Sequence, residues 1–147
     1  MTDCFTRKTR SKVMRAVRSQ GNLSTELKLA RLFRERSLVG WRRRSDLIGN
    51  PDFIFPKKRI AIFADGCFWH GHSCRILSPQ SNVDFWKLKI KRNKIRDRKV
   101  NKQLRNRGWA VIRIWECEIG EKKLDRRLAL IRKRSPRGII ITSVKSA

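Results

Sequence analysis

The sequence has little negative charge. Only 12 of its 147 residues are Asp or Glu, against 38 Lys and Arg, and the formal net charge is +26. A charge of this size disfavours the compact state through self-repulsion, and solubility alone needs far less of it. We therefore expect a polyanionic partner that offsets the repulsion, and nucleic acid is the obvious class.

Long apolar runs are absent as well. No run approaches the length that spans a bilayer, no signal peptide opens the chain, and no strongly amphipathic helix carries a bulky apolar face for a membrane surface. We therefore expect no membrane partner and a cytoplasmic, nucleoid-associated location. The sequence also lacks internal repeats and long linkers, and its length suits one domain over residues 1–147.

Hydrophobic periodicity outlines the secondary structure. It predicts helices over about residues 8–20, 25–36, 84–107 and 121–134, and strands over 39–44, 52–55, 60–64 and 109–115. In the second helix we expect an inward stripe of Leu27, Ala30 and Phe33, with Asn22 or Ser24 as the cap. The order of elements is typical of an α/β fold with a central mixed sheet.

Two boundaries carry further expectations. Gly108 follows the long basic helix and is expected to end it, because glycine readily adopts the left-handed conformation of a helix C-terminus. The tail over residues 135–147 contains three consecutive isoleucines. It either adds an edge strand or is loosely held, and both readings stay open.

Acidic residues are scarce enough that two of them stand out. Asp52 precedes one predicted strand, and Asp65 ends another thirteen residues later. Neighbouring strands could bring both carboxylates to one edge of the sheet, where they would hold Mg²⁺ and leave sites for water and phosphate. The alternative is that Asp52 is a turn residue and Asp65 a loop cap. Spacing alone favours this alternative.

Cysteine and histidine are also scarce, yet they cluster. Three of the four cysteines accompany a histidine in a possible ligand set: Cys67, His72, Cys74 and Cys117, with only Cys4 outside it. In a reducing compartment such cysteines indicate metal ligation rather than disulfides. Three thiolates and one imidazole would form a closed structural zinc site. The alternative reading, small core cysteines beside surface histidines, fits the local density less well.

The second histidine, His70, lies in the same loop. It could orient or deprotonate a water, or protonate a leaving oxygen, because imidazole titrates near neutrality. It could instead replace His72 as the metal ligand, although we favour His72. Next to it are Phe68 and Trp69, with Trp86 further on. These aromatic side chains either insert between base pairs or fill the space under the loop, and the two readings weigh equally.

The run Asp65–Cys74, with the sequence DGCFWHGHSC, closely resembles the signature of the very short patch repair (Vsr) endonucleases. Other marks of the family follow in order along the chain. They are Thr9–Arg15, Glu26, Pro51–Phe53, Phe85–Trp86, Lys91–Asp97, Gly108–Trp109 and Trp115–Cys117. The resemblance extends from about residue 8 to residue 132 and thus covers nearly the whole chain.

This resemblance implies a restriction-endonuclease-like fold, a three-layer sandwich around a mixed sheet. It implies a monomer that binds double-stranded DNA with a T·G mismatch, left by deamination of 5-methylcytosine, and nicks it 5′ to the thymine. Mismatch-repair proteins are candidate partners. Asp52 would be the main Mg²⁺ ligand, His70 a catalytic residue, and Glu26 an accessory acid near the metal.

The resemblance also assigns the remaining residues. The zinc ligands would be Cys67, His72, Cys74 and Cys117. The wedge beside the mismatch would be formed by Phe68, Trp69 and Trp86, with Met14 and Val17 approaching from the other groove on the N-terminal helix.

One departure leaves roles open. Some family members have histidine at the position of Asp65, so the division of labour between Asp65 and His70 is unsettled. Two other functions also stay open: a restriction-type or mobile-element endonuclease that acts on paired DNA, and a zinc-stabilised DNA-binding module that does not cut.

Overall fold

The protein is described by a computed structural model that covers residues 6, 8–9, 11–12, 23–43, 45–74, 81–120 and 122–134. Most of the expected N-terminal helix, including Met14 and Val17, lies outside these residues, as does the whole tail after Arg134. Within the described residues, no helix combines the length and the apolar character needed to cross a membrane.

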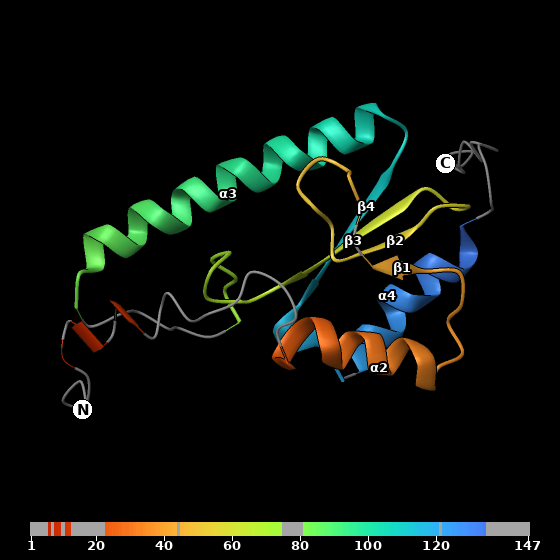
Figure 1. The fold of residues 1–147 in the computed structure, drawn as a ribbon, viewed down its shortest axis with the longest axis horizontal. Coiled ribbons are helices and arrows are strands. Elements are labelled where there is room, and N and C mark those ends of the chain that lie inside the picture. The colour runs from red at the N-terminus through yellow and green to blue at the C-terminus, as the bar shows by residue number, and fades with distance from the viewer. Residues whose placement is uncertain are drawn as a thin grey trace, which may run out of the picture.

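One four-stranded mixed sheet organises the chain (Figure 1). Its strands are β1 (Arg42–Arg43), β2 (Phe53–Phe55), β3 (Ile60–Asp65) and β4 (Ala110–Trp115), in that order across the sheet. The first two pairings are antiparallel, and β3 pairs with β4 in parallel. The expected α/β fold with a mixed sheet is thereby confirmed.

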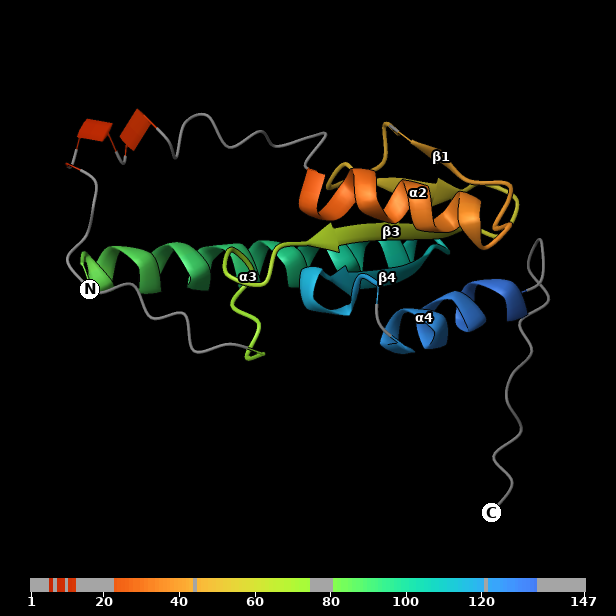
Figure 2. The ribbon, with the colours of Figure 1, turned by 90° about the horizontal axis from the view of Figure 1, so that it is seen from below.

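Helices cover both faces of this sheet. Figure 1 shows α3 (Val83–Asn106) above it, with α2 (Lys28–Glu35) and α4 (Lys122–Lys133) below, and Figure 2 shows α2 and α4 in front of it. Side chains of β3 alternate between the two faces, as strand geometry requires. Ile60 and Ile62 join the core with α2 and α4, whereas Ala61 and Phe63 pack with Leu104 of α3.

The long helix α3 joins the two parallel strands and lies close to its predicted bounds. Its 24 residues span about 36 Å at 1.5 Å per residue. Gly108, with φ +80°, follows its end as expected. Trp86 and Leu104 are its buried side chains, near opposite ends. The C-terminal half covers the sheet, and the N-terminal half extends past it toward the loop that follows β3 (Figure 1).

Two local predictions were wrong. Leu27 was expected to face inward, but it is 37% exposed, and Leu29 is buried with Ala30 and Phe33 instead. The cause is a π-helical turn, η1 (Leu23–Leu27), ahead of α2. A π-turn holds an extra residue, which rotates the following positions relative to a regular helix. The expected caps, Asn22 and the Ser24 side chain, lie outside what the structure describes.

The strand predicted over residues 39–44 shrinks to Arg42–Arg43. Val39 is 81% exposed, and Gly40 takes φ +86°, a conformation that does not continue a strand. The last helix, by contrast, fits its predicted range of 121–134 closely. α4 spans Lys122–Lys133 and buries Leu124, Leu128 and Ile131.

Candidate active site and metal centre

Three acidic side chains meet where β3 ends. Asp65 is the last residue of β3, and Asp52 lies directly before β2. The Asp52 amide donates to the Ile62 carbonyl at 2.9 Å, and the Ala64 amide donates to Asp52 Oδ2 at 2.8 Å. These bonds fix the Asp52 carboxyl group beside the end of β3. Glu26 of η1 reaches the same point and hydrogen-bonds to the Asp52 side chain.

The surroundings of Asp52 raise its pKa from 3.8 to about 7. Burial is the largest cause, and the neighbouring charges of Glu26 and Asp65 add to it, while the hydrogen bond from the Ala64 amide acts in the opposite direction. At neutral pH this carboxyl group is therefore partly protonated. A divalent cation at the site would stabilise the ionised form and displace that proton.

Two arginines compensate the other two acids. Asp65 is 3% exposed and Glu26 is 5% exposed, so both need a partner if they are to stay charged. Arg43 Nη2 donates to Glu26 Oε2 at 2.6 Å, and Arg113 Nη1 donates to Asp65 Oδ2 at 2.6 Å. The acids on either side of Asp52 are thus each paired with a cation.

The imidazole of His70 lies between two carboxylates. Its Nδ1 is 2.6 Å from Asp97 Oδ2, whereas its Nε2 is 3.7 Å from Asp65 Oδ1, too far for a direct hydrogen bond. If Nδ1 carries the proton that it shares with Asp97, the Nε2 lone pair faces the acidic cluster. His70 is thereby oriented to exchange a proton with a group held there.

Asp97 was missed as a site residue, although it lies inside a run that matched the family. It projects from α3 and also approaches Arg113 Nη2 at 3.4 Å. Burial alone would raise its pKa, but the hydrogen bond with His70 and the charges of Arg113, His70 and Arg96 outweigh burial and lower it. The available signal was one acid inside an otherwise basic stretch of helix.

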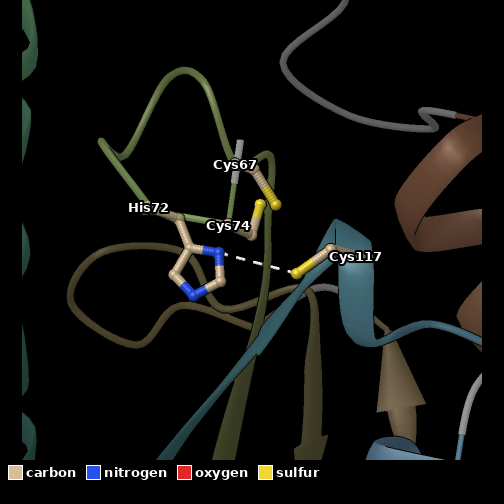
Figure 3. A group of neighbouring side chains, drawn as sticks. All are labelled: Cys67, His72, Cys74 and Cys117. Carbon is tan, nitrogen blue, oxygen red and sulfur yellow. Dashed lines mark hydrogen bonds between the residues drawn. The ribbon is translucent and has the colours of Figure 1, made fainter. Parts of the chain in front are cut away.

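A second cluster contains four potential metal ligands. Figure 3 shows Cys67, His72 and Cys74 of the loop after β3 converging with Cys117, which follows β4. One ligand atom from each residue lies within 4.8 Å of the others. Cys117 Sγ is 3.5 Å from His72 Nδ1. The structure therefore brings together all four residues that the sequence suggested, and the cluster could bind a metal ion.

Without a cation two of these thiols, Cys67 and Cys117, resist ionisation. Burial raises the pKa of Cys67, and burial together with hydrogen bonds from the neighbouring thiols raises the pKa of Cys117 to about 12. A bound metal reverses this effect, since a coordinated thiol loses its proton. The His72 ring also stacks on Trp115, with 4.3 Å between centroids and 8° between planes, which fixes its orientation.

The loop between the two clusters is folded tightly onto α3. The His72 amide donates to the Cys67 carbonyl at 2.9 Å, and Asn93 Nδ2 of α3 donates to the Trp69 carbonyl at 2.8 Å. Gly71 has φ +63°, and a Cβ there would lie 2.5 Å from Lys94 Cε. A side chain at this position would have to displace the side chains of Lys94 and Ile90, and the positive φ favours glycine in any case.

Four aromatic rings gather beside this loop. Phe68, Trp69 and Trp86 contact one another edge to face at centroid distances of 5.3–5.7 Å, and Phe85 extends the group from Trp86. Lys89 Nζ lies 5.3 Å from the centroids of both tryptophans. Trp86 is buried, whereas Phe85 is 57% exposed. The group thus combines mutual packing with an exposed apolar edge.

Comparison with known proteins decides the family. The sequence model of the DNA mismatch endonuclease Vsr matches residues 2–76. A type II nicking enzyme of Xanthomonas oryzae pv. oryzae is 39% identical over 82% of this chain and 89% of its own length. The DNA mismatch endonuclease Vsr of Escherichia coli is 38% identical over 84% of this chain and 80% of its own length. The chain belongs to the Vsr family.

Several Vsr relatives differ in how they are named. A type II nicking enzyme of Neisseria meningitidis is 39% identical over 86% of this chain and 90% of its own length. The Vsr family model ends before Trp86, Asp97, Arg113 and Cys117. These four residues complete the aromatic group, the hydrogen bonds of His70 and Asp65, and the ligand cluster. The second half of this Vsr-family chain therefore contributes residues to both sites.

Proposed function

We propose that the chain is a Mg²⁺-dependent DNA endonuclease that nicks double-stranded DNA 5′ to the thymine of a T·G mismatch, and so initiates very short patch repair. The observation that carries the proposal is the convergence of Asp52, Asp65 and His70 at the end of β3 in a Vsr-family chain. The fold is a restriction-endonuclease-like three-layer sandwich. A DNA substrate places the enzyme in the cytoplasm, where it acts as a monomer and meets mismatch-repair proteins.

The residues at the end of β3 fit a hard cation. Asp52 would hold Mg²⁺, with Asp65 and Glu26 close by, because Mg²⁺ is bound by a few carboxylate oxygens and keeps its other positions for water and phosphate. When bound, the ion lowers the pKa of a coordinated water and offsets charge on the phosphate. The raised pKa of Asp52 fits such a site. A buried carboxyl group with acidic neighbours ionises reluctantly, and a bound cation would compensate the negative charge.

His70 would move the proton. Water attacks phosphorus, a new P–O bond forms, and the bond to the leaving oxygen breaks. Nε2 of His70 either accepts the proton of the attacking water or protonates the leaving oxygen. Asp97 holds Nδ1 and thereby fixes the ring, as an orienting carboxylate does for other catalytic histidines. The proposal therefore gives Asp65 and His70 different roles: Asp65 lies beside the metal ion, and His70 transfers the proton.

The Cys67, His72, Cys74 and Cys117 cluster would hold a structural zinc ion. Zn–S bonds of about 2.3 Å in a tetrahedron place sulfur atoms roughly 3.8 Å apart, and the four ligand atoms, all within 4.8 Å of one another, need only a small contraction. Four protein ligands leave no open position, which suits a structural rather than a catalytic metal.

Phe68, Trp69 and Trp86 would form the wedge. A T·G wobble pair stacks less well than a matched pair, so an aromatic group inserted beside it unstacks that step at lower cost. Edge-to-face packing of the three rings and clamping of their loop by metal ligands would keep the wedge rigid. Met14 and Val17 would approach from the opposite groove.

Truncation of one ring tests the wedge. Trp69→Ala should weaken binding to a T·G duplex by about 1–3 kcal/mol, the usual value of stacking between an aromatic side chain and a base. Affinity for the matched duplex should stay the same, because it rests on phosphate contacts. Equal losses on both duplexes would instead make Trp69 a packing residue of the loop.

The decisive experiment compares nicking of an end-labelled T·G duplex with nicking of its fully paired control in Mg²⁺. Asp52→Ala and Asp65→Ala should abolish cleavage and keep DNA binding, while Asp125→Ala, at an exposed ion pair with Arg36, should leave both intact. Normal cleavage by Asp52→Ala would refute the metal site.

The same assay decides a second candidate function. That candidate is a restriction-type nuclease of this fold that acts on paired DNA. Similar proteins from Xanthomonas oryzae and Neisseria meningitidis are named type II nicking enzymes, with no mismatch in the name. Nicking of the paired control at the rate of the T·G duplex would select that function. A protein that binds both duplexes and cuts neither would be a DNA-binding module.

A further inference from the structure

Arg113 is an unusual residue for its position. It lies inside β4, opposite Phe63 of β3, on the sheet face that otherwise packs apolar side chains against α3. Its side chain is 14% exposed. A charge in such a place is costly unless its surroundings compensate it fully, so its partners are expected to serve a purpose.

Two nitrogens of the guanidinium group donate hydrogen bonds, and the third lies near a carboxylate. Nη1 donates to Asp65 Oδ2 at 2.6 Å, and Nε donates to Asn101 Oδ1 of α3 at 3.1 Å. Nη2 approaches Asp97 Oδ1 at 3.4 Å, and Cζ lies 4.4 Å from the Phe63 ring centroid. The planar group therefore has one fixed orientation, which a flexible ammonium could not reproduce.

These contacts close a ring of four side chains. Arg113 joins Asp65 to Asp97, Asp97 holds His70, and the Nε2 of His70 returns to within 3.7 Å of Asp65. Both carboxylates that flank the imidazole are thus held by the same cation. The position of His70 relative to Asp65 therefore depends on Arg113 through these two carboxylates.

The same cation limits what else Asp65 can bind. Its Oδ2 is taken by Arg113, and a metal ion on Oδ1 would lie only a few ångströms from a fixed positive charge. At such distances the repulsion between a divalent ion and a guanidinium group is strong. Glu26 is likewise paired with Arg43, whereas Asp52 has no arginine or lysine partner among the residues that the structure describes.

We propose that Arg113 is a positioning residue that stands in for a second divalent cation: it fixes Asp65 and Asp97 around His70 and leaves a single metal ion, at Asp52, for the reaction. This inference rests on the proposed nuclease function. It gives Asp65 the role of an oriented carboxylate beside the metal site, rather than a ligand that bridges two ions.

The test separates the charge of Arg113 from its geometry. Arg113→Gln removes the cation, and Arg113→Lys keeps a cation that can reach only one of the two carboxylates. Arg127→Gln is the matched control, because Arg127 pairs with Glu118 at 3.2 Å, outside this ring of side chains, and carries the same charge. Melting temperature and bound zinc show which variants are folded.

The first measurement needs no DNA. Binding of Mn²⁺ to the zinc-loaded protein is followed by the electron paramagnetic resonance signal of free Mn²⁺. Arg113→Gln should bind Mn²⁺ several-fold more tightly than the unmodified chain and gain a second equivalent, because it exposes the charges of Asp65 and Asp97. Arg113→Lys and Arg127→Gln should bind one equivalent with ordinary affinity.

The second measurement is single-turnover nicking at saturating Mg²⁺ and DNA. Arg113→Gln should be slower by roughly 10–100-fold, the usual effect of losing a residue that orients metal-site groups, with DNA affinity unchanged. Arg113→Lys should be intermediate, and Arg127→Gln normal. Tighter metal binding combined with slower cleavage cannot come from general loosening of the fold, which would weaken both.

Unchanged Mn²⁺ binding in folded Arg113→Gln overturns the inference, and so does a second Mn²⁺ in the unmodified protein. If Arg113→Gln fails to fold, a normal rate in Arg113→Lys overturns it and a reduced rate with one Mn²⁺ supports it. If the unmodified chain nicks no duplex at all, the proposed function fails, while the Mn²⁺ measurement still decides the role of Arg113.

Discussion

At the scale of single residues, His70 belongs to one of two neighbouring sites, the acidic cluster or the cysteine–histidine cluster. Both histidines of the chain lie within three residues of each other, and from the sequence either could have been the metal ligand. In the structure Nδ1 of His72 points at Cys117, whereas Nδ1 of His70 points at Asp97 on α3. A change at each histidine should therefore have a different consequence.

We expect His70→Ala to slow nicking by about 10²–10⁴-fold, the range usual for the loss of a general acid or base. Its zinc content and melting temperature should stay close to those of the unmodified chain. His72→Ala is the contrasting variant and should lose zinc. Elemental analysis and single-turnover nicking measure both effects. Loss of zinc from His70→Ala with an unchanged rate would instead make His70 the zinc ligand and His72 the catalytic candidate.

Asp52 should make stability depend on pH in the Mg²⁺-free protein. Its pKa is about 7 when folded and near 3.8 when unfolded, so the folded state binds more protons between these values. Stability that comes from the protonated carboxyl group is full below about pH 4 and is lost as pH rises through 7. Asp52→Asn removes this loss, so the variant should be the more stable protein at pH 8.

Urea unfolding of the zinc-loaded, Mg²⁺-free proteins at pH 5 and pH 8 measures the effect. The advantage of Asp52→Asn over the unmodified chain should be larger at pH 8 than at pH 5. Asp125→Asn, at an exposed position, serves as the control and should show no such pH dependence. An advantage of equal size at both pH values would mean that the Asp52 carboxyl group titrates normally.

Elements with a clear period were predicted well. β3, β4, α3 and α4 were expected within one or two residues of their bounds, because continuous apolar runs and helical stripes depend on local sequence alone. The π-turn of η1 was not, since it changes the helical period within one turn and leaves no mark in composition. Short β1 depends on its pairing with β2 rather than on its own residues.

The site residues also divide into those that local sequence predicts and those that it does not. Acids and metal ligands that lie together in sequence, or directly after strands, were found from spacing and resemblance. Asp97 and Arg113 were missed, because a charged residue in a basic helix or in a strand usually indicates a solvated face. Their meeting depends on how α3 crosses the parallel pair β3 and β4, a tertiary contact that periodicity does not contain.

The conformation of the loop from Cys67 to Cys74 should depend on its bound metal ion. Its backbone has few hydrogen-bonded turns of its own beyond those at His70, Gly71 and His72, and the Cys117 ligand ties it to the end of β4. Removal of zinc by a chelator should lower the melting temperature and abolish nicking, and added Zn²⁺ should restore both. Elemental analysis should find one zinc per folded chain. Cys4→Ser, outside the ligand set, is the control and should behave as the unmodified chain.

A stripped protein with an unchanged melting temperature would make these cysteines ordinary packing residues. Partial loss of T·G preference before any loss of fold would be the more informative result. It would show that the metal holds the aromatic rings in place, because Phe68 and Trp69 directly follow the first ligand.

At the scale of the whole molecule, charge and shape separate two kinds of DNA contact. Basic side chains are spread over the chain, and α3 alone carries Lys87, Lys89, Lys91, Arg92, Lys94, Arg96, Arg98, Lys99, Lys102 and Arg105. The aromatic group, in contrast, occupies one place beside the N-terminal half of α3. Phosphate contacts should therefore set affinity for any duplex, and the aromatic group should set preference for the mismatch.

Salt should separate these contributions. Affinity for a matched duplex should fall steeply with salt, with a log–log slope of about −0.9 for each phosphate neutralised. The ratio of T·G to matched affinity should change little, because stacking releases no counterions. Lys94→Gln, whose side chain lies against the loop at Gly71, should reduce the slope by about 1 on both duplexes and leave their ratio unchanged. Arg31→Gln, at an exposed pair with Glu35 on the opposite face, is the control and should keep the full slope. Binding titrations at four or more salt concentrations give both the slope and the ratio of affinities. If the preference for T·G disappeared as salt rises, charged side chains rather than the aromatic rings would recognise the mismatch.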